Sequence, residues 1–185
     1  MRMPILETER LRIRPFGLDD LEAAGRFLEY SDAERQAYLE WSAMNHQLLA
    51  WLDQPPYGDR GIELKASGEL IGAVGYVPYL LPLQQLTALQ DFPSQPETYC
   101  YTAAVGLYYV ISPAHRRQGY ASEATRGMID YAFSTLRLDH IIATTGYNNL
   151  ASQFVMRRLG MRVMQNPHSE PAWLQVIGVL KNDRC

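Results

Sequence analysis

A strand-to-helix junction near the middle of the chain limits most strongly how this chain can fold. An apolar and aromatic run at 105–111 is typical of a buried strand, and Ser112-Pro113 ends it. Apolar residues then recur at helical spacing from 121 to 136. The hexapeptide Arg-Arg-Gln-Gly-Tyr-Ala at 116–121 stands between the two elements. The sequence therefore predicts a basic, glycine-containing turn that leads directly into a helix.

This junction carries the features that a pyrophosphate-binding loop needs. The first turn of a helix has backbone N–H groups without partners, and the helix dipole is positive at that end. Gly119 leaves room for close approach, Ala121 keeps the first turn thin, and Arg116 and Arg117 add positive charge. An ordinary basic loop fits the spacing equally well. Both the three-glycine dinucleotide fingerprint and the P-loop are absent from the sequence.

Two segments of the chain resemble the GNAT N-acetyltransferases. Residues 111–124 are similar to their motif A, Arg/Gln-x-x-Gly-x-Gly/Ala, and Arg116, Gly119 and Ala121 fill its fixed positions. Residues 149–161, with Asn-x-x-Ser followed by Leu-Gly-Met, resemble a second segment of the same superfamily. Together with residues 7–15, they are most similar to the branch that contains the ribosomal-protein N-terminal acetyltransferases. The resemblance spans nearly the whole chain, apart from an insert at about 78–100.

The resemblance implies the acyl-CoA N-acyltransferase fold, which is a mixed α/β (α+β) architecture. Its sheet is mixed, mostly antiparallel and twisted, with about seven strands and helices on both faces. The residue patterns agree with this order of elements. We expect strands at 10–14, 61–66, 69–77, 105–111, 140–145, 161–164 and 173–180, and helices at 21–28, 32–51, 121–136 and 150–159.

Three expectations concern which faces of these elements are buried. The arginines of the first strand are predicted to form a solvated face. Ser31 and Glu34 form a capping box for the second helix. Side chains at helical spacing in that helix are predicted to be core, although one or two of the rings would line an acceptor groove if the resemblance holds. These side chains are Ala37, Tyr38, Trp41, Met44, Leu48 and Trp51. The last helix is expected to bury Phe154, Val155 and Leu159.

The resemblance also implies acetyl-coenzyme A as co-substrate and indicates where it would bind. Val110 and Ile111 are expected to pair with the pantetheine arm, and Asn149 to contact that arm from the other side. Tyr120 is left with two alternatives, packing on the cofactor or in the core. The pyrophosphate would be held by Arg116, Arg117, Gln118, Gly119, Tyr120, Ala121 and Ser122.

The implied reaction moves the acetyl group directly from the thioester to a primary amine in a ternary complex. The acceptor would be a protein N-terminus or a small-molecule amine. A free α-amino group has a pKa of about 7.7 to 8.0, so it needs little help from a general base. The N–H group of Ile111 is the expected donor to the tetrahedral oxyanion.

The general acid and base are not evident from the sequence. Many GNAT enzymes have a tyrosine four residues after the serine of the second segment, but Met156 stands there. Ser152 and Tyr147 are the candidate acids, and their alternative roles are a helix cap and a turn aromatic. The candidate bases are Glu63, Asp91 and Glu97.

Two other functions stay open. The chain could be a non-catalytic CoA-binding or regulatory domain of the same fold. It could also be a protein-interaction module that uses the insert at about 78–100. The stretch 78–98 contains four prolines and many leucines and glutamines, with a short helix expected around 83–89. A lid, a dimer contact and a plain surface loop are the alternatives for this insert.

Composition narrows the class of protein. A chain of 185 residues suits one domain, here 1–185, and the net charge of -3 argues against a nucleic-acid partner. Cys100 and Cys185 form no disulfide framework, which favours a reduced, cytoplasmic location. No run is apolar enough for a membrane span, and the four histidines lack ligand spacing, so we expect no membrane and no metal partner. A homodimer is an open alternative.

Overall fold

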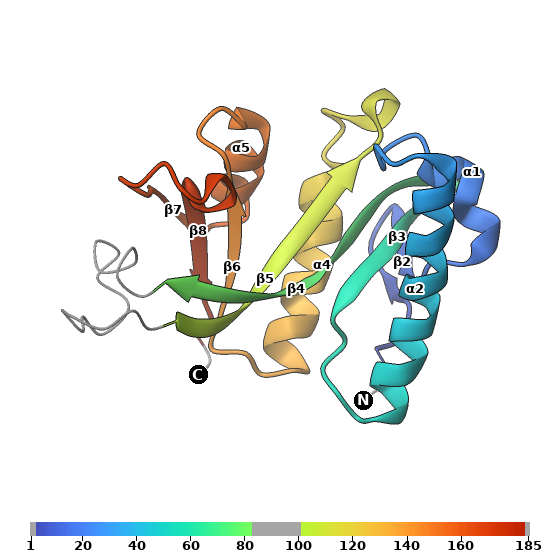
Figure 1. Cartoon of the computed structure of the whole chain (residues 1–185), viewed down its shortest axis with the longest axis horizontal. Coiled ribbons are helices and arrows are strands. Elements are labelled where there is room, and N and C mark those ends of the chain that lie inside the picture. Colours follow the sequence, from blue (N-terminus) through green and yellow to red (C-terminus); the bar gives the residue numbers. More distant parts are fainter. Residues whose placement is uncertain (1–2, 83–100, 184–185) are drawn as a thin grey trace. The chain divides into compact units, whose positions relative to one another are not determined.

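The computed structural model describes residues 3–82 and 101–183 (Figure 1). Internal contacts divide the chain into two compact units. Unit 1 comprises Met1–Val77 and Tyr108–Tyr131, and unit 2 comprises Pro78–Leu107 and Ala132–Cys185. The description as one domain stays a prediction.

The strands form one mixed sheet in the order β1-β2-β3-β4-β5-β6-β8-β7. Strands β5 and β6 are parallel, whereas the pairs β1–β2, β2–β3, β3–β4, β6–β8 and β7–β8 are antiparallel. The predicted mixed, mostly antiparallel sheet is therefore confirmed, with the short β1 as an additional strand. The strands are β1 (Leu6–Glu7), β2 (Leu11–Arg14), β3 (Gly58–Leu64), β4 (Leu70–Pro82), β5 (Tyr101–Ile111), β6 (His140–Thr145), β7 (Arg162–Gln165) and β8 (Val176–Lys181). The helices are α1 (Leu21–Ala24), α2 (Asp32–Trp51), α4 (Tyr120–Ser134) and α5 (Leu150–Arg158), and 3-10 turns lie at Leu18–Asp20, Pro113–His115 and Ala172–Leu174.

Unit 1 has helices on both faces of its strands. On one face, α1 and α2 pack against the strands through a buried apolar cluster that includes Leu39, Leu70 and Ala73. On the other face lies α4, where Tyr76 Oη donates a hydrogen bond of 2.6 Å to Met128 O. Ala73 and Tyr76 are three residues apart on β4, so they point to opposite faces. The expectation of helices on both faces is confirmed for this unit.

Unit 2 contains the parallel pair β5–β6 and the antiparallel strands β8 and β7 (Figure 1). Ile142 of β6 and Ile177 of β8 belong to its apolar core, together with Leu174 of the last 3-10 turn. Gly178 points to the opposite face, where Met156 Sδ of α5 lies 3.2 Å from the position that a Cβ would take. The missing side chain therefore lets α5 pack directly on β8.

Helix α2 turns its predicted core face to solvent, so that prediction is wrong. Trp41, Met44 and Trp51 are 53%, 65% and 81% exposed. The side chains that the helix buries are Leu39 and Ser42. Of the six side chains predicted as core, the exposed ones are Ala37, Trp41, Met44, Leu48 and Trp51, whereas Tyr38 is half-buried.

Polar contacts with Asp59 on β3 set the rotation of α2. The Tyr38 hydroxyl donates a hydrogen bond to the Asp59 carboxylate. His46 Nε2 lies 2.8 Å and Ser42 Oγ 3.4 Å from the Asp59 carbonyl oxygen. These three side chains are spaced by four residues and therefore share one helical face. Hydrophobic periodicity detects only a helix face that apolar side chains bury. It therefore missed the face of α2 that polar contacts hold, which explains the wrong prediction of its core face.

The predicted boundaries agree with the structure in some elements and not in others. The capping box of Ser31 and Glu34 starts α2 as expected. Strand β4 continues to Pro82 and takes in the start of the segment predicted to be an insert, whose helix near 83–89 lies outside the described residues. In α5, Phe154 is 63% exposed, against the prediction, and Met156 is buried in its place. No helix within 3–82 and 101–183 is long and apolar enough to cross a membrane.

The close approach of β4 and β5 allows a test of packing at Gly72. We expect Gly72→Ala to lower the free energy of unfolding by about 1–3 kcal/mol, because its Cβ would lie 2.2 Å from Val110 O. Denaturant unfolding measures this loss. The matched control is Gly17→Ala, since the nearest atom to that Cβ is 3.9 Å away. Equal stability of the two variants would contradict the predicted clash.

Candidate functional site

The end of β5 presents the backbone of Ile111 away from β4. Ser112 N donates a hydrogen bond of 2.8 Å to Ile71 O on β4, and Val110 O faces Gly72 on the same strand. Backbone groups alternate in direction along a strand. The N–H and C=O groups of Ile111 therefore point to the edge opposite β4. Of the two residues predicted to pair with the cofactor arm, Val110 directs its carbonyl at β4 and Ile111 is the one with outward backbone groups.

The loop between β5 and α4 has two residues in the left-handed region. Arg117 has φ of 61° and Gly119 has φ of 86°. For a side chain such as that of arginine this backbone conformation is uncommon, and such strain concentrates at functional sites. Arg116, just before them, is extended (φ -68°, ψ 160°). Successive backbone N–H groups in a turn can form a concave anion-binding nest, and we refer to the N–H groups of residues 117–122 as the nest.

The nest continues into the first turn of α4. Glu123 N donates to Gly119 O at 3.0 Å, which is the first hydrogen bond of the helix. The N–H groups of Tyr120, Ala121 and Ser122 precede that bond, so the helix offers them no carbonyl partner. Gly119 stands at the N-terminal boundary without a side chain to cover them. The positive end of the dipole and two exposed arginines, Arg116 and Arg117, add to the attraction for an anion.

Side chains of the loop also hold its shape. Arg116 Nε donates to Ile111 O at 3.1 Å, and Gln118 Nε2 donates to Ala114 O at 3.3 Å. His115 Nδ1 lies 2.9 Å from Ser112 Oγ. These three contacts therefore hold the conformation of the loop through its own side chains.

A clamp that sequence reasoning missed joins this loop to the first residues of unit 1. Arg10 donates from Nε to Glu123 Oε2 at 2.7 Å and from Nη1 to Gln118 O at 3.1 Å. Thr8 Oγ1 donates to Glu123 Oε1 at 2.5 Å. Burial alone would raise the pKa of Glu123, but the hydrogen bonds from Thr8 and Arg10 outweigh it and hold the pKa below its usual value. We refer to Thr8, Arg10 and Glu123 as the clamp.

The clamp also decides where Tyr120 lies. The Arg10 guanidinium carbon is 4.4 Å from the centroid of the Tyr120 ring, which is a cation–π contact. Tyr120 is half-buried. This ring is therefore placed against Arg10, an arrangement that the two alternatives drawn from the sequence did not include.

Unit 2 brings the other predicted residues together at the start of α5. Asn149 Oδ1 accepts from Ser152 N at 3.1 Å, so Asn149 is the residue that caps α5. The Tyr147 hydroxyl donates to Asn166 O, and Tyr147 N donates to Gln175 Oε1 at 2.9 Å. The helix-cap role considered for Ser152 thus belongs to Asn149, and the Tyr147 hydroxyl is already committed to a carbonyl.

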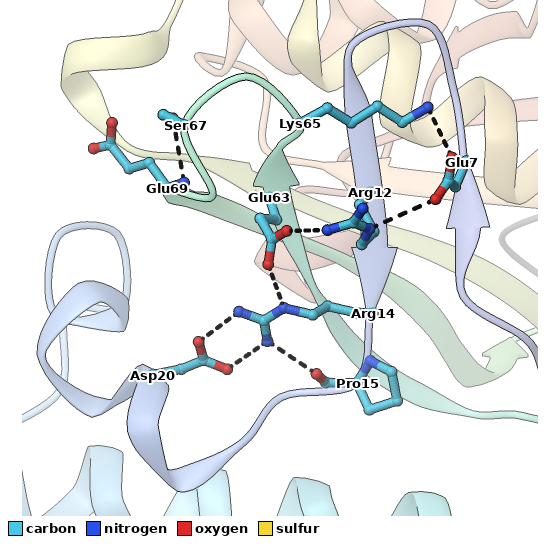
Figure 2. Close-up of polar contacts among 9 residues, drawn as sticks. All are labelled: Glu7, Arg12, Arg14, Pro15, Asp20, Glu63, Lys65, Ser67 and Glu69. Carbon is cyan, nitrogen blue, oxygen red and sulfur yellow. Dashed lines mark hydrogen bonds and ion pairs between the residues drawn. The ribbon is translucent and has the colours of Figure 1, made fainter.

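The arginines of β2 are paired with acids (Figure 2). The predicted solvated face is only partly right, since the side chain of Arg12 is 41% exposed and that of Arg14 is 24% exposed. Arg12 and Arg14 both donate to Glu63 of β3, at 2.8 and 2.7 Å. Arg14 also makes two bonds of 2.8 Å to Asp20. Arg12 lies opposite Glu63 in the strand register, which spacing along one strand does not reveal. Glu63 is consequently a structural partner of two arginines and a poor candidate base, whereas Asp91 and Glu97 lie outside the described residues.

Clusters of metal ligands form no part of this site. Within residues 3–82 and 101–183, no group of three or more His, Cys, Asp or Glu side chains is arranged to hold a metal ion.

Comparisons with known proteins agree with this geometry. The chain matches the acetyltransferase (GNAT) domain over residues 10–162. It is 41% identical over 161 residues to the uncharacterized N-acetyltransferase YnaD of Bacillus subtilis (strain 168), with 85% of this chain and 82% of that protein covered. The chain belongs to the GNAT acetyltransferase family. The predicted family is thereby confirmed.

Solved structures share the GNAT fold of this chain. A putative ribosomal-protein-serine acetyltransferase from Vibrio cholerae has a TM-score of 0.68 at 18% identity, over 98% of this chain and 99% of that one. RimL, a ribosomal L7/L12 alpha-N-protein acetyltransferase in complex with coenzyme A, has a TM-score of 0.64 at 13% identity, over 98% and 100%. At these identities the likeness establishes the fold.

The clamp in this GNAT protein is expected to stabilise the folded chain at neutral pH and to lose this effect at acid pH. Because the pKa of Glu123 is lower in the folded chain, its stabilisation is present above the usual value of 4.5 and is lost as the pH falls through the folded value. We expect Glu123→Gln to cost roughly 1–2 kcal/mol at neutral pH and progressively less as the pH falls below 4.5. Urea unfolding at neutral pH and at a series of acid pH values measures the difference.

Glu9→Gln is the control for this prediction, since Glu9 is an exposed neighbour of the clamp. A loss for Glu123→Gln that stays constant with pH would contradict the role given to the Glu123 carboxylate.

Proposed function

We propose that this chain is an acetyl-CoA-dependent N-acetyltransferase that transfers the acetyl group directly to a primary amine in a ternary complex. The observation that carries the proposal is the nest of N–H groups formed by Arg117, Gly119 and the first turn of α4, next to the outward backbone of Ile111. An anionic pyrophosphate and an amide-rich pantetheine arm match these two features.

The cofactor residues divide by the part of the molecule that they would hold. The N–H groups at 117–122 and the charges of Arg116 and Arg117 would bind the pyrophosphate. The Ile111 carbonyl, which already accepts from Arg116 Nε, would accept a second hydrogen bond from a pantetheine amide, as in an added strand, and the Ile111 N–H would face the thioester oxygen. Asn149 would donate from Nδ2, because its Oδ1 already caps α5. Val110 packs its side chain against the α1–α2 cluster, so its part in binding would be to position Ile111.

The chemistry proposed for Ile111 follows from the direction of its N–H group. Attack of a neutral amine on the thioester carbon places negative charge on the carbonyl oxygen, and a fixed backbone donor stabilises that charge. The carbon–sulfur bond then breaks, and the thiolate takes a proton from the nitrogen. Fixed donors of this kind are worth about 10²–10³ in rate.

The relatives support this proposal without deciding the acceptor. YnaD carries the name of an N-acetyltransferase, and the RimL structure contains coenzyme A. A protein N-terminus and a small-molecule amine are both acceptors consistent with the site. The reduced, cytoplasmic location expected from the two cysteines fits an acetyl-CoA-dependent enzyme.

A second function, CoA binding without catalysis, is favoured by two observations on the candidate acids. Met156 occupies the position of the usual acid and is fully buried against Gly178. The Tyr147 hydroxyl is engaged with Asn166. Tight acetyl-CoA binding together with no turnover of any amine would favour this alternative.

Acetyl-CoA binding tests the nest directly. A ligand at ~100 times its dissociation constant stabilises the folded state by about 2.7 kcal/mol. We expect acetyl-CoA to raise the thermal midpoint of the wild type but not of Gly119→Glu, whose side chain would begin 3.4 Å from Arg10 Nη2 and would bring negative charge beside the nest. Gly68→Glu is the matched control, because Gly68 also has a positive φ (73°) and no atom lies within 4 Å of its Cβ position.

The proposal requires that Gly68→Glu keep the acetyl-CoA response. Loss of the response in both variants would mean that strain, and not occupation of the nest, is responsible. Absence of a response in wild-type protein shown to be free of CoA would overturn the proposed cofactor.

Two substitutions of Asn149 can separate its role as the cap of α5 from its proposed role in cofactor binding. Asn149→Ser keeps an oxygen that can accept from Ser152 N but removes the amide. We expect its thermal midpoint to stay within about 1 °C of the wild type, as a retained cap implies, while KM for acetyl-CoA rises several-fold. Asn149→Ala should lose both the cap and the contact. An unchanged KM in the serine variant would remove Asn149 from the cofactor site.

A further inference from the structure

Asp59 is an exception among the buried and half-buried carboxylates of unit 1. Asp20, Glu63 and Glu123 each bind an arginine. Asp59 makes no ion pair in the described parts of the chain, and its carboxylate accepts one hydrogen bond, from Tyr38. The adjacent Arg60 occupies the opposite face of β3 and donates to Pro4 O. A half-buried carboxylate without a cation is costly to fold, which makes it a candidate functional group.

The strands leave room for this carboxylate at Gly75. Asp59 pairs with Gly75 in the β3–β4 register. A Cβ on Gly75 would lie 2.4 Å from Gly58 O and 2.7 Å from both Asp59 Cα and Asp59 Oδ1, so only glycine lets the β3 backbone and the carboxylate come this close to β4. The missing side chain lets Asp59 and Tyr108 of β5 interact across β4. The Asp59 carboxylate thus lies over Gly75 of β4.

Tyr38, which binds the Asp59 carboxylate, lies next to two further aromatic rings on the side of α2. The Tyr38 ring centroid lies 5.8 Å from that of Tyr30 and 6.1 Å from that of Trp41. Tyr30 and Trp41 are 49% and 53% exposed, so the group opens to solvent. Aromatic faces around a carboxylate attract organic ammonium ions. This group, formed by Asp59, Tyr30, Tyr38, Trp41 and Tyr108, is called the Asp59 cluster below.

The cluster holds no positive charge that would compensate Asp59. Burial raises the pKa of Asp59, and the hydrogen bond from Tyr38 only partly offsets this. Burial, with a smaller contribution from Asp59, also raises the pKa of Tyr38 and of Tyr108, so both phenols stay protonated. Burial lowers the pKa of His46, the other titratable group that contacts Asp59 from α2, and this favours its neutral form.

The cluster is attached to the strand that carries the proposed oxyanion donor. Tyr108 precedes Ile111 by three residues on β5, a separation of roughly 10 Å. Tyr108 and Val110 both pack toward the α1–α2 side. An amine held at the cluster would therefore have its path to the thioester along this face of β5.

We propose that the Asp59 cluster binds the ammonium form of the acceptor and that Asp59 takes its proton. This proposal rests on the proposed acetyltransferase function. One N–H bond of the ammonium breaks and an O–H bond forms on the Asp59 carboxylate, directly or through one water. The neutral amine then forms the C–N bond as the C–S bond breaks, and its second proton passes to the thiolate. Asp59 returns its proton to water, so one amide, one thiol and one proton are produced.

Asp59→Asn tests this assignment by its pH dependence, because the amide keeps an acceptor for Tyr38 but takes up no proton. With a serine-initiated tetrapeptide as acceptor, we expect kcat/KM at about pH 6.5 to fall at least ~100-fold. The deficit should shrink above the α-amino pKa of about 8, where the peptide is already neutral. The acetyl-CoA thermal shift should be unchanged.

Purely structural damage by Asp59→Asn would lower kcat/KM by the same factor at every pH, and that result would overturn the proposal. Glu29→Gln, an exposed neutralisation next to Tyr30, is the control and should retain wild-type kcat/KM. Turnover by the wild type with no effect of Asp59→Asn would reject the cluster and leave the acetyltransferase function standing. Absence of turnover by the wild type with this peptide and with tyramine would reject both.

Tyr38→Phe gives an independent readout with the Asp59 carboxylate intact. The Tyr38 hydroxyl lowers the pKa of Asp59, so its removal should raise that pKa and move the acid limb of kcat/KM to higher pH. An acid limb that stays in place, or moves to lower pH, would contradict the role of Asp59 as the proton acceptor.

Discussion

The ion pair between Arg10 and Glu123 connects the start of the chain to the loop on which cofactor binding is proposed to depend. Glu123 lies in the first turn of α4, and Arg10 bonds both that carboxylate and the Gln118 carbonyl. An isolated exposed pair adds little to stability. Here the pair is reinforced by the Thr8 hydroxyl and the Arg10 N–H, so four donors converge on one carboxylate. The strained backbone at Arg117 is held within this framework.

Local patterns predicted the elements well where one segment determines its own structure. The strand at 140–145 and the capping box of Ser31 both follow from neighbouring residues. Motif A located the nest for the same reason. Errors arose where distant segments decide the outcome. The register that sets Arg12 opposite Glu63, and the contacts of Asp59 that rotate α2, join residues far apart in the sequence.

Charge pairing distinguishes structural acids from the proposed functional one. Asp20 and Glu123 have lowered pKa values because the hydrogen bonds they receive, from arginines and from neighbouring groups, outweigh burial. Asp59 has a raised pKa because burial outweighs its single hydrogen bond. The sequence shows an aspartate at both Asp20 and Asp59 and does not reveal which of them has the raised pKa. The difference lies in which donors and cations the fold places beside each carboxylate, and that is a property of the folded chain.

The rotation of α2 has a consequence for how this protein can diversify. Its orientation depends on directional bonds to Asp59, and its exposed rings contribute little to the apolar core. Substitutions at Met44 or Trp51, which lie outside the Asp59 cluster, therefore change the outer surface without creating a cavity. Substitutions at such positions put the stability of the fold at little risk. This surface of the helix can therefore evolve contacts with new binding partners while the sheet beneath it is preserved.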